Sequence, residues 1–196
     1  MFTHYFTKAV GPQSFWQPFY LTKLLLTTIA LCTSTLAFAS ADSPFEIKTV
    51  EAMSYVYSTQ TLQQGKSHQQ GEKIAEATAF FIATKTDTLI DGSFTYVFDN
   101  IDENALQKTQ QVDANLGWPV KKLATATPGY QQKELPSFKC LTLIHKGPST
   151  EVLDSWQKLQ AEAKARGLKF TGHARAIIKL SSNTGYVISE LQLGIN

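Results

Sequence analysis

The order of strand-like and helix-like segments repeats within this chain of 196 residues, and the repeat limits the possible folds more than any other feature. Two segments with helical periodicity begin about 80 residues apart. Each follows a segment rich in β-branched and aromatic residues, and two more such segments come after it. The sequence therefore predicts a strand–helix–strand–strand unit that occurs twice, without obvious sequence identity between the copies.

The first copy covers about residues 45–122 and contains one amphipathic helix. Its apolar positions follow the i, i+3, i+4, i+7, i+8 spacing of a helix with one buried face. They are Ile74, Ala77, Thr78, Phe81 and Ile82. Strands are predicted over 45–60, with a kink near Glu51–Ala52, and over 93–100 and 109–120.

The second copy covers about residues 129–196. A strand is predicted over 138–145, and a helix follows over 150–166. The helix carries an apolar stripe of Val152, Trp156, Leu159 and Ala163. Gly167 stands where a left-handed helix cap belongs, and two further strands follow.

These elements predict an α+β fold made of duplicated β-α-β-β modules. Each module forms a small sheet with a helix on one face. Two modules side by side give one curved antiparallel sheet with both helices on one face and a cleft on the other.

The N-terminal segment has the layout of a secretory signal peptide. Lys8 and Lys23 precede an apolar run, 24–39, that ends in small residues. We expect a signal peptide over 1–39, a short leader over 40–44 and the binding domain over 45–196. Cleavage two residues later and an uncleaved membrane anchor are the alternatives, although a run of sixteen residues, five of them Ser or Thr, is short for a spanning helix.

Removal of this segment would change the formal charge from +2 to 0, because the segment holds two lysines and no acid. A neutral surface without a Lys/Arg cluster argues against nucleic-acid binding. One cysteine, Cys140, would remain, so no internal disulfide can form. We expect an exported protein, periplasmic or extracellular, with no membrane association after cleavage and with a monomer as the default state.

The last strand, 186–195, carries an acid in an otherwise apolar setting, and side-chain alternation separates its two faces. The apolar face should pack on the helices and consists of Val187, Ser189, Leu191, Leu193 and Ile195. The other face holds Tyr186, Ile188, Glu190 and Gln192. If that face lines the cleft, Glu190 is a partly desolvated carboxylate. The alternative is a solvated face on which Glu190 pairs with Lys179.

Aromatic residues are the other candidate site residues. Tyr96 and Phe98 share a strand face, and Trp118 and Trp156 lie near strand and helix ends. Aromatic walls with one carboxylate can hold an organic cation. Ordinary core packing is the alternative, above all for Trp156 in its apolar helix stripe.

No catalytic or cofactor-binding motif is present in the sequence. His68, His145 and His173 are not spaced as ligands of a metal box, so no cofactor and no metal are expected. Axial ligation of a haem by one of them is left open. Cys140 is predicted to be a buried thiol in its strand.

Three segments together resemble the GyrI-like small-molecule-binding domains. "KELPSFKCLTLIHKGPSTEVLDSWQKL" resembles the start of the second half of that family, "ANLGWPV" the end of its first half, and "YVISELQLGI" its last strand. The resemblance covers about Phe45 to the C-terminus. The same superfamily contains the effector-binding domains of AraC-type regulators and the haem-associated SOUL proteins.

The resemblance implies a cleft between the halves, lined by aromatic residues, into which a glutamate matching Glu190 projects. Trp156 matches an aromatic residue of the family helix, and Pro119–Val120 match the end of the first half. Ser149–Thr150 depart from a common tyrosine, and Gly194 departs from a common proline. The helix-turn-helix of AraC-type members has no counterpart here, so no role in transcription is expected.

The leading hypothesis is a binding protein for a small organic molecule, cationic or aromatic, held between the two halves. The candidate ligand-binding residues are Glu190, Tyr96, Phe98, Trp118, Trp156 and Tyr186. One alternative is a small-molecule hydrolase with Glu190 as general base. The other is an inhibitor-like module that binds a protein partner.

Overall fold

The computed structural model describes residues 43–63, 67–101 and 111–196. The chain divides into two compact units, Met1–Ala41 and Asp42–Asn196, and every described residue belongs to the second. The predicted signal peptide lies outside the described residues.

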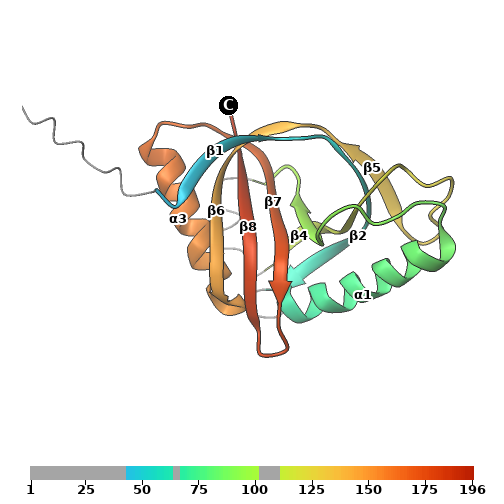
Figure 1. Ribbon diagram of the computed structural model, residues 1–196. Helices are drawn as coiled ribbons and strands as arrows, with labels where there is room; N and C mark the ends of the chain where they lie inside the picture. The colour runs from blue at the N-terminus through green and yellow to red at the C-terminus, as the bar shows by residue number, and fades with distance from the viewer. Residues whose placement is uncertain (1–42, 64–66, 102–110) are drawn as a thin grey trace, which may run out of the picture. The chain divides into compact units, whose positions relative to one another are not determined.

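The second unit contains one eight-stranded antiparallel sheet with helices packed on it (Figure 1). The elements of the first half are β1 (Phe45–Val50), β2 (Met53–Gln63), α1 (Ser67–Lys85), β3 (Thr95–Phe98) and β4 (Gln111–Val120). Those of the second half are β5 (Gln131–Leu135), β6 (Phe138–Pro148), a 3-10 turn η1 (Ser149–Glu151), α3 (Val152–Ala165), β7 (Phe170–Ser181) and β8 (Tyr186–Ile195). The predicted α+β duplication with an open curved sheet is confirmed.

The first strand of each half is broken in two. The kink predicted near Glu51–Ala52 separates β1 from β2, and Pro136–Ser137 separate β5 from β6. The sequence did not predict β5, because its polar residues lack the alternation of a half-buried strand.

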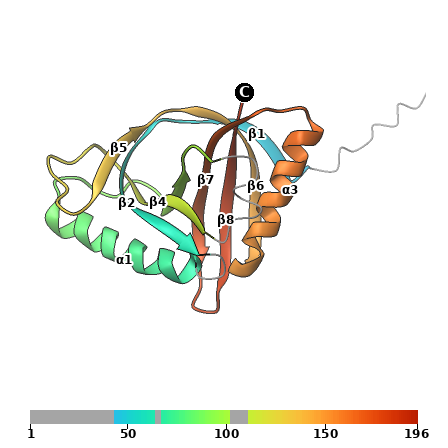
Figure 2. The same ribbon diagram turned by 180° about the vertical axis from the view of Figure 1, so that it is seen from behind.

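These broken strands join the two halves into one sheet. The strand order is β1-β6-β8-β7-β3-β4-β2-β5, so β1 of the first half pairs with β6 of the second, and β5 pairs with β2. Figures 1 and 2 show the β1–β2 and β5–β6 ribbons passing across the sheet from one half to the other. The halves also meet at the centre, where Tyr96 of β3 pairs with Ala176 of β7.

Both helices pack on the same face of the sheet, over the main core cluster. Trp156, Leu159 and Ala163 of α3 belong to that cluster together with Leu191 and Leu193 of β8. The half-buried Ile74 and Ala75 of α1 pack against the same cluster. The predicted division of β8 into a helix-facing and an opposite face is therefore confirmed.

The buried face of α1 differs in one position from the predicted one. Thr78 and Ile82 are buried as expected, but Ala77 is exposed and Gly71 is buried instead. The prediction for Ala77 was wrong because the buried stripe runs through Gly71, Thr78 and Ile82, and Ala77 lies beside it. Gly71 was missed because a glycine gives no signal in a pattern of apolar side chains. Among the described helices, none is both long enough and apolar enough to span a membrane.

Candidate functional site

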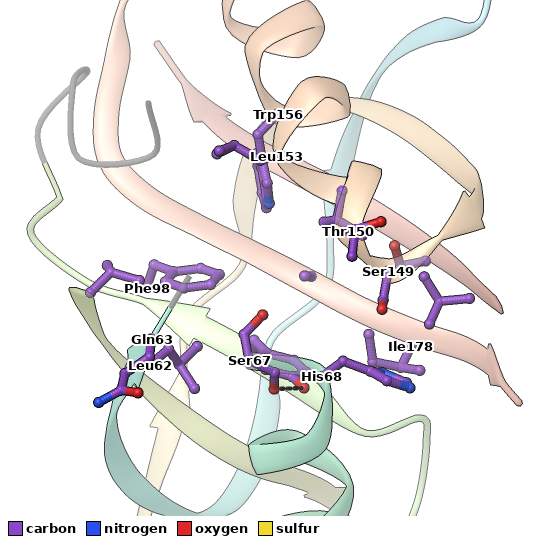
Figure 3. Close-up of a pocket in the computed structure, with 16 residues that line it drawn as sticks. Leu62, Gln63, Ser67, His68, Phe98, Ser149, Thr150, Leu153, Trp156 and Ile178 are labelled. Atoms are coloured by element: carbon purple, nitrogen blue, oxygen red, sulfur yellow. Dashed lines mark hydrogen bonds between the residues drawn. The ribbon is translucent and has the colours of Figure 1, made fainter. Parts of the chain in front are cut away.

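A pocket of about 360 Å³ opens on the helix-bearing face, where the two halves meet (Figure 3). Its floor comes from the central strands β3, β7 and β8, through Tyr96, Ala176 and Ser189. The end of β2 and the start of α1 border one side, and η1 with the start of α3 borders the other. The pocket therefore lies between side chains that the chain brings together from both halves.

Aromatic side chains form much of the wall. Phe98 and Trp156 meet edge to face, with ring centroids 6.2 Å apart and planes at 86°. This is one of the preferred geometries of aromatic pairs. Trp156 is 4% exposed and also belongs to the main core cluster, so it serves both core and pocket. Three of the predicted site residues, Tyr96, Phe98 and Trp156, border the pocket.

Tyr96 is held against α1 by the absence of a side chain at Gly71. A Cβ at this position would lie 1.6 Å from the Tyr96 hydroxyl oxygen and 2.7 Å from Cζ. The Tyr96 hydroxyl donates to the carbonyl oxygen of Ser67 at 3.4 Å. Burial raises the pKa of Tyr96 well above its usual value, so the hydroxyl stays a neutral donor.

Polar side chains also line the pocket. Ser149 and Thr150 lie across the pocket from Phe98 and Leu62 in Figure 3, and His68 and Gln63 are further polar lining residues. These polar residues were not predicted as site residues. The signal that was available is their position beside sequence breaks, at the Gly147–Pro148 turn and at the start of α1.

The pocket brings together helix-side residues, and Glu190 is not one of them. Glu190 projects from β8 to the opposite face of the sheet, next to Ile144 of β6 and Ile177 of β7. The cleft predicted from the sequence would lie on that opposite face, whereas this pocket lies on the helix side. The reason is alternation along β8, which directs Val187 and Ser189, rather than Glu190, into the pocket.

Glu190 is 7% exposed and is paired where it stands. Lys48 Nζ lies 2.6 Å from Oε1, and Lys179 Nζ lies 3.6 Å from Oε2. Gln192 Nε2 donates to Oε1 at 2.7 Å. Burial alone would raise the pKa of the carboxyl, but the hydrogen bonds from Lys48 and Gln192 outweigh burial and lower it. The pairing with Lys179 is the one that the alternative reading of the sequence expected.

Trp118 and Tyr186 also lie outside the pocket lining. Trp118 packs on Phe94 with ring centroids 5.3 Å apart, and its Nε1–H donates to the carbonyl oxygen of Ala75 at 3.0 Å. It therefore attaches α1 to the sheet. Tyr186 stands at the start of β8, opposite Pro148, and is exposed.

A second polar network occupies the face opposite the helices. The fully buried Arg175 donates from Nε to His173 Nε2 at 3.0 Å and from Nη2 to the carbonyl oxygen of Pro136 at 3.1 Å. Because His173 Nε2 accepts this bond, its proton is on Nδ1, which donates to Asp99 Oδ1 at 2.8 Å. Lys133 contacts the other oxygen of Asp99 at 2.6 Å.

This network holds the β5–β6 break against the centre of the sheet. The bond from His173 lowers the pKa of Asp99, and burial lowers the pKa of Arg175 to about 10. Within the described ranges no group of three or more His, Cys, Asp or Glu side chains could hold a metal ion. Cys140, predicted as a buried thiol, is buried and free.

The fold and pocket define a small α+β domain of two related halves, with a pocket where the halves meet. The chain belongs to the GyrI-like small molecule binding domain family, whose model matches residues 43–193. No curated protein sequence matches the chain.

Solved structures share the fold at low sequence identity. The C-terminal domain of EcmrR has a TM-score of 0.64 and 12% identity, with 78% of this chain and 96% of that chain covered. SAV2435, solved with bound tetraphenylphosphonium, has a TM-score of 0.51 and 9% identity, with 78% and 93% covered. A hydrolase from Listeria innocua has a TM-score of 0.51 and 13% identity, with 78% and 91% covered. EcmrR in a DNA complex scores 0.66 at 11% identity, but the match covers 57% of that longer chain.

Proposed function

We propose that this protein binds a small organic molecule, largely apolar or aromatic, in the pocket on the helix side of the sheet. The observation that carries the proposal is the pocket itself, about 360 Å³ in volume and walled by Tyr96, Phe98 and Trp156. Ligand sites are typically concave and mostly apolar, with a few polar groups that fix orientation. The family supports a small-molecule ligand, and the tetraphenylphosphonium complex of SAV2435 supports an aromatic one, although that ligand is a cation.

Binding is a better account than hydrolysis. A general base must reach the proton that it removes, directly or through one water. Glu190 points away from the pocket, and its two lysine partners hold it as a carboxylate. Among the described residues, the partners of Glu190 are Lys48, Lys179 and Gln192, which lie on the same face, so we do not propose it as a base or as the anchor of this pocket.

We also propose that residues 1–39 are a signal peptide and that the domain acts outside the cytoplasm, in the periplasm or the medium. The basic start, the apolar run and the small residues at its end support this. A neutral mature chain supports the further proposal that it acts without nucleic acid, and we propose a monomer as the default state. Mass spectrometry of the protein recovered from expressing cells would test the cleavage, and a mass that includes residues 1–39 would refute it.

A thermal-shift screen with neutral aromatic, cationic aromatic and lipid-like compounds tests the binding proposal, because a ligand that binds only the folded state raises the melting temperature. Ala176→Leu, which adds bulk to the pocket floor, should weaken any hit. Glu190→Gln changes the opposite face and should leave the affinity unchanged. If no compound raises the melting temperature, the ligand-binding proposal fails and the protein-interaction alternative is favoured.

A further inference from the structure

We infer that the pocket takes an uncharged ligand with a hydrogen-bonding group at one end, and that the hydroxyl of Ser189 binds this group. The inference rests on the proposed function and goes beyond it, because it names the charge class of the ligand and its polar anchor. Three independent features of the pocket support it.

The first feature is the lack of formal charge in the lining. No Asp, Glu, Lys or Arg is among the described residues that border the pocket. His68 borders it, and its Nε2 lies 3.2 Å from Oε1 of Glu72, which itself is not part of the lining. A cation or an anion in the pocket would meet no opposite formal charge among the described lining residues, and burial without such a partner is costly. A neutral molecule avoids this cost.

The second feature is a buried hydroxyl without a partner. Ser189 borders the pocket and is 1% exposed, and its Oγ is itself buried and makes no hydrogen bond to any described residue. Buried polar groups almost always have a partner, so an orphan hydroxyl at a pocket wall points to a group supplied from the pocket.

The neighbouring histidine cannot supply that partner. His145 pairs with Ser189 across β6 and β8, and so lies on the same face. Its Nε2 contacts the carbonyl oxygen of Pro148 at 3.2 Å, so Nε2 carries the proton, and Nδ1 contacts the hydroxyl of Ser155 at 2.9 Å. Both ring nitrogens are therefore occupied, and the Ser189 hydroxyl is left for a ligand.

The third feature is the mixture of apolar and neutral polar side chains in the rest of the lining. Phe98, Leu62 and Ile178 are apolar, whereas Gln63, Ser149 and Thr150 carry amide or hydroxyl groups (Figure 3). A ligand with an aromatic or aliphatic body and a carbonyl, hydroxyl or similar neutral group matches this composition.

The test compares probes that have nearly the same shape and differ in charge. Triphenylphosphine oxide is neutral and carries an acceptor oxygen, whereas methyltriphenylphosphonium carries a positive charge and no acceptor. Both head a panel of matched neutral and cationic aromatic pairs, and affinity for the full chain is measured by calorimetry. We expect the neutral member to bind at least about tenfold more tightly in the pairs that bind, because only the cation must be buried unpaired.

Two variants test the anchor. Ser189→Ala should weaken the neutral acceptor probe by about two- to tenfold, the range for one hydrogen bond. It should not lower the melting temperature of the unliganded protein, because it removes an unsatisfied group. Thr78→Val is the matched control, since Thr78 is also fully buried with an unpartnered hydroxyl but does not border the pocket. It should leave the affinity unchanged.

Each outcome decides between the proposals. Cationic members that bind as tightly as their neutral partners, or more tightly, overturn the inference and leave the binding function intact. Neutral preference with no effect of Ser189→Ala overturns Ser189 as the anchor. If no member of any pair binds and the wider screen is also negative, both the inference and the proposed function fall.

Discussion

Alanine in place of Gly71 should destabilise the protein, although this substitution usually stabilises a helix. Inside a helix, alanine is favoured over glycine by about 1 kcal/mol. Here the added Cβ would lie 1.6 Å from the Tyr96 hydroxyl oxygen, so the ring must move toward the pocket. Overpacking of this kind costs about 1–3 kcal/mol. The net expectation is a loss of up to about 2 kcal/mol in the free energy of unfolding.

A double-mutant cycle separates the two effects. In a Tyr96→Leu background the clash is absent, and Gly71→Ala should then stabilise by about 0.5–1 kcal/mol. Equilibrium unfolding in urea gives all four free energies, and the coupling between the two positions should be about 1–3 kcal/mol. Phenylalanine is a weaker test, because Cζ of the ring would still lie 2.7 Å from the new Cβ.

Gly71→Ala should also weaken ligand binding, because a displaced Tyr96 ring would occupy part of the pocket. The reasoning is refuted if Gly71→Ala stabilises the unmodified protein as much as it stabilises the Tyr96→Leu variant. In that case the Tyr96 ring would not lie against α1.

Three further predictions concern the contacts around the sheet. Glu190→Gln should lower the free energy of unfolding by about 1–2 kcal/mol at pH 7, since the carboxylate is nearly buried but its lysine partners are partly exposed. Folding lowers the pKa of Glu190, so the stabilisation by its carboxylate is present above the unfolded-state pKa of about 4.3 and is lost as pH falls through the lowered value. The free energies of unfolding of the unmodified protein and of Glu190→Gln, measured in urea at several pH values, should therefore converge in acid. A difference that stays constant with pH would contradict this. Trp118→Phe should cost about 1 kcal/mol by removing the bond to Ala75, with ligand affinity unchanged, as urea unfolding and calorimetry would show. Nitrogen NMR should find neutral His173 protonated on Nδ1, because Nε2 accepts from Arg175; an Nε2–H tautomer would exclude the hydrogen-bond chain described above.

Local patterns predicted the parts of the fold that depend on near neighbours in sequence. Alternation along β8 identified the face that packs on the helices, and Leu191 and Leu193 are buried there. The helical spacing from Val152 to Ala163 identified α3 and its buried stripe. Such patterns are readable because each residue's direction follows from its position within one element.

Of the candidate site residues predicted from the sequence, Tyr96, Phe98 and Trp156 border the pocket, whereas Glu190 lies on the other face of the sheet. Tyr96, Phe98 and Trp156 are large apolar residues on helix-facing positions, which alternation and periodicity can detect. A pocket among them depends on how two distant halves pack, and no local pattern records that.

The sequence by itself thus determined the order of the elements other than β5, and the buried face of most positions in α3 and β8. Tertiary structure alone decided which distant residues meet. Lys48 reaches Glu190 only because β1 pairs with β6 at the edge of the other half, and Tyr96 reaches α1 only because Gly71 leaves space for its hydroxyl. These contacts are set by strand pairing and by packing across the sheet. For that reason the Glu190 carboxylate belongs to an ion-paired cluster, whereas its neighbour Ser189 borders the pocket.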